Sequence, residues 1–413
     1  MAKVNSLGSN KNIQRKDIII TIFLGLYVFS SYWPIGRRSL ILGSLVLYAF
    51  LGLTLFKLIT KQTPLKITAY SIGYLVFGIL GAISFFYALD SDYVFSDLYL
   101  IFVALILTFS FIQYVQDYSG FVRIFSFYAY LPIFLVLFFY TSGTFANPGQ
   151  RLGNYEFGNA NNLAIAMMIS LCCVLWFLVN AKRKYFLLNI ICAIVFLYVI
   201  SLSGGRKYLL IPFIFLLLVL IFNYWNNKPK LILYGIVFAL ILFAGIWAVI
   251  NIPVLYNKVG IRYEGLLNFA EGDLFNTDSS TLIRAMMIEN GWRWFLQQPL
   301  QGYGLNNFGV LISGFIGWHV YAHNNFIELM VDLGAVGLIL YYSLYVYIIA
   351  KLFCIKNDVT GIRNFFLAFM LALLFFEIGA VTYQLYIIQI FVGLASAYIW
   401  IQGKNLKVTA IIE

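Results

Sequence analysis

The chain has 413 residues, of which 62% are hydrophobic and 10% are charged, with 40 Phe and 30 Tyr. This composition is too apolar for a soluble domain of any class and predicts an integral membrane protein. The formal net charge of +11 is expected to reflect membrane topology and attraction to anionic lipid, and it does not indicate nucleic acid binding.

Apolar runs long enough to cross a bilayer as helices recur from one end of the chain to the other. We therefore predict an all-α integral membrane protein, organised as a single polytopic domain over residues 1–413. The first apolar run follows three cations and lacks a small-residue cleavage site, so it is expected to remain as an uncleaved helix. About twelve spans are predicted, near residues 18–34, 39–57, 67–88, 97–115, 122–141, 162–180, 185–203, 208–225, 231–250, 325–350, 364–383 and 384–401.

The distribution of cations predicts the orientation. With the amino terminus inside, nine of the 27 Lys and Arg residues fall outside, and the remaining eighteen fall inside. This excess of positive charge places both termini in the cytoplasm. The nine external cations are Arg37, Arg38, Arg151, Arg206, Lys207, Lys258, Arg262, Arg284 and Arg293. Three of the four cysteines lie within apolar runs, so no disulfide is predicted.

The longest polar segment, residues 251–323, is predicted to be a large external loop between the ninth and tenth spans. Loops of this length are usually functional. Within it, Asp278 and two serines supply helix-cap residues, and residues 281–298 read as an amphipathic helix that Pro299 ends. Residues 307–316 predict a second short helix at the membrane interface. The predicted apolar stripe of the first helix is Leu282, Ile283, Met286, Met287, Phe295 and Leu296.

Seven of the nine predicted external cations are arginines. The guanidinium group can donate hydrogen bonds to two phosphate oxygens at once and stays charged. The excess of arginine over lysine therefore favours a phosphate or pyrophosphate ligand at the outer face. Chance and the snorkelling of arginines at helix ends are the alternative. Arg206 follows a Gly-Gly pair that could expose amide donors, and Arg151 lies in a glycine-flanked loop; a plain turn with a solvated arginine also explains each.

Arg284 lies on the amphipathic helix, eight residues before Trp292, so the two side chains are about 80° apart around the helix axis. A cation beside an aromatic ring suits a phosphorylated sugar. The alternative is that Trp292 packs on the membrane while Arg284 stays exposed.

His319 and His323 are the only histidines in the chain. Glu328 and Asp332 follow His323 inside an otherwise apolar run, where ionisable groups are costly and often functional. His323 could therefore act as a general base toward a substrate hydroxyl. A cap on the tenth span, formed with Asn324, is the alternative. His319 is the weaker candidate, and the pair lacks the glutamate and third ligand of a zinc site.

These features together resemble the O-antigen ligase and polymerase superfamily, the Wzy/WaaL-like membrane glycosyltransferases. The large late external loop and the roughly twelve spans agree with that family. The residues that carry the resemblance are Arg284 with Trp292, then Pro299-Leu300-Gln301-Gly302-Tyr303-Gly304, His323-Asn324 with Glu328, Leu333-Gly334-Ala335-Val336-Gly337, Arg151 with the asparagines at 159–162, and Ser203-Gly204-Gly205-Arg206. The two glycines before Arg206 depart from the family's commoner Ser-Arg form.

The resemblance implies a GT-C-like fold and inverting glycosyl transfer from undecaprenyl-pyrophosphate-linked oligosaccharide to an acceptor hydroxyl, without a metal or other cofactor. It implies His323 as the catalytic base, with Arg206 and Arg284 stabilising the departing pyrophosphate. Substrate contacts are expected from Arg151, Arg262, Trp292, Arg293, Tyr303, Asn324 and Glu328. A Wzy-type polymerase of O-antigen, capsule or exopolysaccharide, in a bacterial cytoplasmic membrane, is the preferred interpretation.

Two other interpretations stay open. A ligase shares these motifs but attaches finished polymer to another acceptor. A lipid-linked oligosaccharide flippase or transporter would also have many spans, although transporters usually show internal repeats and charges at the bilayer midplane, and neither is evident here. A chain-length regulator and a flippase are expected partners of a polymerase.

Overall fold

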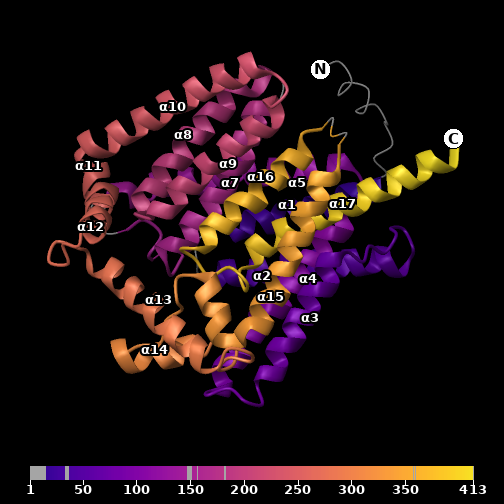
Figure 1. The fold of residues 1–413 in the computed structure, drawn as a ribbon. Coiled ribbons are helices and arrows are strands. Elements are labelled where there is room, and N and C mark those ends of the chain that lie inside the picture. Colours follow the sequence, from indigo (N-terminus) through magenta and orange to yellow (C-terminus); the bar gives the residue numbers. More distant parts are fainter. Residues whose placement is uncertain are drawn as a thin grey trace. The chain divides into compact units, whose positions relative to one another are not determined.

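The computed structural model describes residues 15–32, 37–146, 151–155, 157–180, 183–356, 358 and 360–412. Every regular element within these residues is a helix (Figure 1), so the predicted all-α fold class is confirmed. The side chains of three predicted external cations, Arg37, Arg38 and Lys258, lie outside the described part of the chain.

Eight of the described helices are long and apolar enough to cross a membrane, judged by length and composition. Three shorter apolar helices, Ile18–Ser31, Gly43–Ile59 and Ala69–Ser84, coincide with the first three predicted spans. These helices fit a membrane protein with about the predicted number of spans. The eight are Ser91–Tyr114, Tyr118–Thr141, Ala160–Asn180, Phe186–Ser203, Arg206–Tyr224, Lys228–Asn251, Asn325–Cys354 and Tyr386–Gly403.

The chain divides into two compact units. The first comprises Met1–Pro64, Tyr114–Tyr263 and Asn357–Ala372, and the second comprises Leu65–Gln113, Glu264–Lys356 and Leu373–Glu413. Three helices have residues in both units, namely α4 (Ser91–Tyr114), of which only Tyr114 belongs to the first unit, α12 (Ile261–Ala270) and α16 (Ile362–Glu377).

The first unit is built around α7, most of which is buried. This helix contacts α5, α8 and α9, whereas α10 contacts α9 and has Phe238 as its one buried residue among those described. The exposed apolar side chains of α10 are what a lipid-facing helix presents. The helices of this unit are α1 (Arg15–Ser31), α2 (Arg37–Ile59), α5 (Tyr118–Tyr130), α6 (Pro132–Thr141), α7 (Ala160–Asn180), α8 (Phe186–Ser203), α9 (Arg206–Tyr224), α10 (Lys228–Asn251), the short α11 (Pro253–Leu255) and the π-helical turn η4 (Tyr256–Gly260).

The second unit is built around α15, which contacts α3, α13 and α17. Figure 1 shows α13 and α14, two of the helices within the predicted external loop, side by side, and they also contact each other. Both agree with the predicted helices at residues 281–298 and 307–316. The elements of this unit are α3 (Ala69–Ser84), α4 (Ser91–Tyr114), α13 (Ser279–Gln297), α14 (Phe308–Ile316), α15 (Asn325–Cys354) and α17 (Tyr386–Ile412).

The long helix α15 is broken at Gly334, which has a left-handed backbone with φ of 63°. The segment after α13 docks at this break: the Tyr303 amide donates to the Val331 carbonyl at 2.9 Å, and the Ala335 amide donates to the Pro299 carbonyl at 2.8 Å. A Cβ atom on Gly334 would lie 2.3 Å from the Leu300 carbonyl oxygen. The glycine-containing motifs at 299–304 and 333–337 are therefore two sides of one joint.

Candidate functional site

Helix α13 begins where the sequence predicts. The carboxylate of Asp278 caps it by accepting a hydrogen bond from the Thr281 amide at 3.1 Å. Two of its side chains, Met287 and Trp294, enter a buried cluster with Phe308 and Ile327 from α14 and α15. The cluster fixes the part of the predicted external loop that precedes the histidines.

The face that α13 buries differs from its predicted apolar stripe at the carboxyl end. Leu296, in the stripe, is 60% exposed, and Trp294, outside the stripe, is buried. Gly291 explains the difference, because its missing side chain allows close approach to α15: a Cβ atom there would lie 2.4 Å from Ile327. Met287, Gly291 and Trp294 have the spacing of one helix face, so α13 packs through this face.

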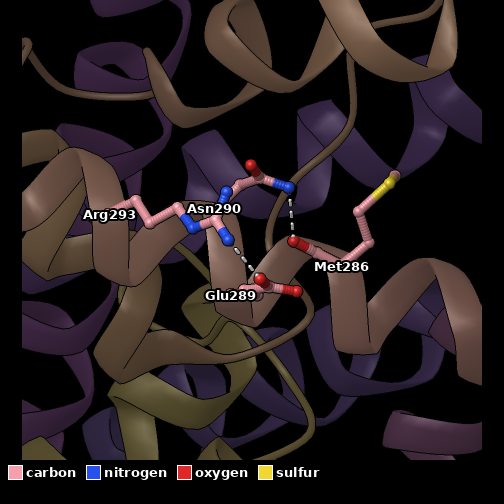
Figure 2. Close-up of polar contacts among 4 residues, drawn as sticks. All are labelled: Met286, Glu289, Asn290 and Arg293. Atoms are coloured by element: carbon pink, nitrogen blue, oxygen red, sulfur yellow. Dashed lines mark hydrogen bonds and ion pairs between the residues drawn. The ribbon is translucent and has the colours of Figure 1, made fainter.

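The polar residues of α13 lie on another face. Figure 2 shows the Arg293 guanidinium 2.6 Å from the Glu289 carboxylate in an exposed i,i+4 pair, and the Asn290 amide donating to the Met286 carbonyl. Arg284 is partly buried, and none of the described residues forms a hydrogen bond or ion pair with it. The half-exposed Trp292 packs on Phe295 of the same helix, with 5.5 Å between ring centroids.

His323 lies in a sharp turn immediately before α15. Its backbone is left-handed, with φ of 56°, and its ring centroid lies 4.3 Å from that of Tyr321. The next residue, Asn324, caps α15, since its side-chain oxygen accepts hydrogen bonds from the Phe326 and Ile327 amides at 3.0 and 3.1 Å. The helix cap considered for this region is thus supplied by Asn324, which leaves the His323 imidazole outside the capping interaction.

The two acidic residues after His323 serve different segments. Glu328 is 1% exposed and accepts a hydrogen bond from the Ala322 amide through Oε2. Asp332 accepts hydrogen bonds from the Phe308 amide at 2.7 Å and from the Asn306 amide at 2.8 Å. The carboxylate of Asp332 therefore holds the start of α14, while that of Glu328 holds the histidine turn.

Two buried acidic residues of the second unit were not among the residues predicted from the sequence. Asp97 accepts hydrogen bonds from the Asn306 side chain at 2.9 Å and from the Tyr383 hydroxyl at 2.6 Å. Glu377 accepts hydrogen bonds from two tyrosine hydroxyls of α15, each at 2.9 Å, and from the Thr382 hydroxyl. Both residues lie at the edges of apolar runs, where ionisable groups are costly. This feature could have identified them, as it identified Glu328.

His319 has a packing role in the second unit. Its ring stacks on Tyr93 with 3.8 Å between centroids, and its Nε2 lies 3.3 Å from the Asn306 carbonyl oxygen. Burial lowers the pKa of His319, although the Asn306 carbonyl and the Asp90 carboxylate act in the opposite direction. These contacts agree with its lower rank as a catalytic candidate.

Three predicted phosphate-binding arginines gather at one turn of the first unit. This turn joins α8 to α9 at Gly204 and Gly205, and Gly204 is left-handed with φ of 70°. Arg151 donates through Nε to the Ser203 carbonyl at 2.6 Å, and Arg262 donates to the Gly204 carbonyl at 2.9 Å. Arg206, the first residue of α9, donates to the Arg262 carbonyl. We call Arg151, Arg206 and Arg262 the arginine cluster.

The predicted site residues thus fall into two groups, each described within its own unit. The arginine cluster belongs to the first unit, whereas Arg284, Trp292, Arg293, Tyr303, His323, Asn324 and Glu328 belong to the second. In the second group, Tyr303 is buried in the cluster with Trp294, and its hydroxyl donates to the Gln297 side chain at 3.0 Å.

The described residues thus define an all-helical membrane protein with many apolar spans, an arginine-rich turn and a histidine turn at a helix start. Residues 191–342 match the family model described as O-antigen ligase. This segment is similar to the O-antigen ligase/polymerase superfamily, and it contains every predicted site residue except Arg151. The curated proteins contain no match to the chain.

Proposed function

We propose that the protein polymerises oligosaccharide repeat units carried on undecaprenyl pyrophosphate, at the outer face of a bacterial cytoplasmic membrane and with both termini inside. The family match at residues 191–342 carries this proposal. It supports a glycosyltransferase-like activity of the O-antigen ligase/polymerase type, and the choice of polymerase rests on the modest size of the external loop.

The arginine cluster supports a role for the first unit in holding the pyrophosphate. Two of its guanidinium groups donate to the adjacent carbonyls of Ser203 and Gly204, which orients both toward the same turn. Carbonyl acceptors carry no formal charge, so these bonds orient the guanidinium groups without cancelling their positive charge. Negative charge that builds up on a departing pyrophosphate would be stabilised by such a group of arginines.

The reaction is a single displacement. The acceptor hydroxyl oxygen forms a bond to the anomeric carbon while the bond from that carbon to the pyrophosphate oxygen breaks, and the pyrophosphate leaves with the electron pair. The hydroxyl proton passes to the imidazole of His323, and the anomeric configuration inverts. Arg284, partly buried without an ion-pair partner among the described residues, is the second unit's candidate to stabilise the leaving group.

The His323→Ala variant in the native host tests the proposal. Removal of the base should abolish long polymer, a loss on the order of 100-fold or more, while single repeat units accumulate on the carrier lipid at the outer leaflet. Polymer length is read on gels, and the side of accumulation is read by labelling from outside intact cells.

His319→Phe is the matched control, because it removes the other histidine and keeps an aromatic ring against Tyr93. This variant should still make long polymer. Normal polymer from His323→Ala at normal protein levels would rule out the assigned base. Finished polymer retained on the carrier lipid would indicate a ligase, and repeat units retained inside would indicate a flippase.

A further inference from the structure

The turn that carries His323 is attached to α15 through the residue before it. Ala322 is 1% exposed, and its side chain belongs to the buried cluster with Met287, Trp294 and Ile327. A buried amide needs a hydrogen-bond acceptor, because leaving one unsatisfied costs about 1–3 kcal/mol. The Ala322 amide finds this acceptor in the Oε2 atom of Glu328, one turn into the helix.

His323 itself adopts a backbone conformation that has to be enforced. A left-handed residue other than glycine costs on the order of 1–3 kcal/mol and persists where its surroundings determine it. The surroundings act from both sides here: Glu328 holds the amide of the preceding residue, and the Asn324 cap fixes the following one on α15. The direction of the imidazole depends on both attachments.

The Glu328 carboxylate makes no other hydrogen bond within the described part of the chain. Its Oε1 atom is buried and has no hydrogen-bond partner among the described residues, so the carboxylate serves the histidine turn alone. In the neighbouring acid Asp332, each carboxylate oxygen accepts a hydrogen bond from a backbone amide, one from Asn306 and one from Phe308. With 1% of its surface exposed, Glu328 is also closed to a sugar ligand, although the sequence predicts it as a substrate contact.

We propose that Glu328 is a positioning residue, which holds His323 in its reactive orientation by accepting the hydrogen bond of the Ala322 amide. The proposal rests on the proposed function, in which His323 receives the proton of the acceptor hydroxyl. Glu328 acts through the backbone, so an uncharged acceptor of the same length should replace it in part.

The experiment compares Glu328→Ala with Glu328→Gln in the full-length protein. Misplacing a catalytic group by about 1 Å can cost 100-fold in rate, so Glu328→Ala should lose 10- to 100-fold. Glu328→Gln keeps an acceptor oxygen and should retain at least ten times the rate of Glu328→Ala. Lipid-linked repeat units extracted from a host strain that lacks this protein serve as substrate, and the rate is measured between pH 5.5 and 8.5.

Hydrogen exchange of the purified protein in nanodiscs gives a readout independent of activity. Exchange of peptides that contain Ala322 should rise in Glu328→Ala and remain slow in Glu328→Gln. Asp332→Ala is the control for position, since it should raise exchange at Phe308 and Asn306 and leave Ala322 protected.

The outcomes separate the two proposals. Unchanged Ala322 exchange in Glu328→Ala, or equal loss of rate in Glu328→Ala and Glu328→Gln, would overturn the positioning role. A pH–rate profile shifted by Glu328→Gln would also overturn it, because a group that acts only through the backbone leaves the titration of the base in place. Raised exchange in Glu328→Ala together with a fully active His323→Ala would instead overturn the role of His323 and leave the contact between Glu328 and Ala322 standing.

Discussion

Burial against Tyr93 makes the neutral form of His319 the favoured one, and this has a consequence for stability. The pKa of His319 in the folded protein lies below its ordinary value of 6.5. The unfolded chain therefore binds a proton at this residue more readily than the folded protein does. The free energy of unfolding should fall as the pH drops from about 7 through the unfolded pKa near 6.5, and this loss should end below the folded pKa.

His319→Phe tests this pH dependence. The phenyl ring keeps the stacking on Tyr93 but cannot be protonated, so the fall in thermal unfolding midpoint between pH 7.5 and pH 5 should be smaller than in the wild type. The midpoint is measured on the detergent-solubilised protein at both values. An identical fall in the two proteins would show that His319 titrates normally, and Asp90 would then offset the effect of burial.

The sequence indicated which polar residues are unusual, but it did not indicate which groups they bind. Glu328 and Asp332 stood out as ionisable groups in an apolar run, and both are buried acceptors. The sequence could not show which amides they hold, because Ala322, Asn306 and Phe308 are brought to them by the folding of the external loop. Asp97 was passed over for the same reason: its partner Asn306 is 209 positions away along the chain.

At the scale of elements, the break in α15 depends on Gly334. An alanine there would keep a backbone with φ of 63° and ψ of −164°, a region essentially restricted to glycine, at a cost on the order of 1–3 kcal/mol. Its Cβ atom would also approach the Leu300 carbonyl carbon to 2.4 Å, so the joint with residues 299–304 would have to open. Gly334→Ala should therefore lower the unfolding midpoint and reduce polymer formation.

Gly235→Ala is the matched control for this joint. Gly235 lies inside α10, and a Cβ atom added there would meet no other atom within 4 Å. Alanine should therefore change the free energy of unfolding by no more than about 1 kcal/mol. Thermal unfolding in detergent compares the two variants. Equal unfolding midpoints for Gly334→Ala and Gly235→Ala would mean that the break in α15 accommodates an alanine without loss of stability.

Helix positions followed from the sequence, whereas the face that each helix buries did not. The cap at Asp278 and the proline at 299 define α13 locally, and the structure agrees with both limits to within a residue or two. The buried face could not be predicted from the apolar stripe, because Gly291 has no hydrophobic side chain, although a Cβ atom there would lie 2.4 Å from Ile327. Close packing through a glycine is a property of two elements, so neither helix alone encodes it.

At the scale of the whole molecule, each unit carries residues for one of the two proposed roles. Arg206 belongs to the first unit and His323 to the second. If the arginine cluster holds the pyrophosphate and His323 acts on the acceptor hydroxyl, then variants of the two residues should both lose polymer formation but for different reasons. Loss of a charge-assisted contact to phosphate costs about 1.5–3 kcal/mol, whereas loss of the base leaves the binding of the donor unaffected.

Binding of undecaprenyl pyrophosphate to the purified variants separates these two roles. Arg206→Ala should weaken binding by roughly 10- to 100-fold, as that energy implies, and His323→Ala should bind as the wild type does. Lys230→Ala is the control, because this variant removes an exposed positive charge at the start of α10, in the same unit but outside the arginine cluster. The difference in affinity between Arg206→Ala and the wild type should become smaller at high salt, because screening reduces the contribution of each exposed charge. Equal binding by Arg206→Ala and wild type would remove the pyrophosphate role from the cluster, and chance and snorkelling at helix ends would then explain the predicted excess of external arginines.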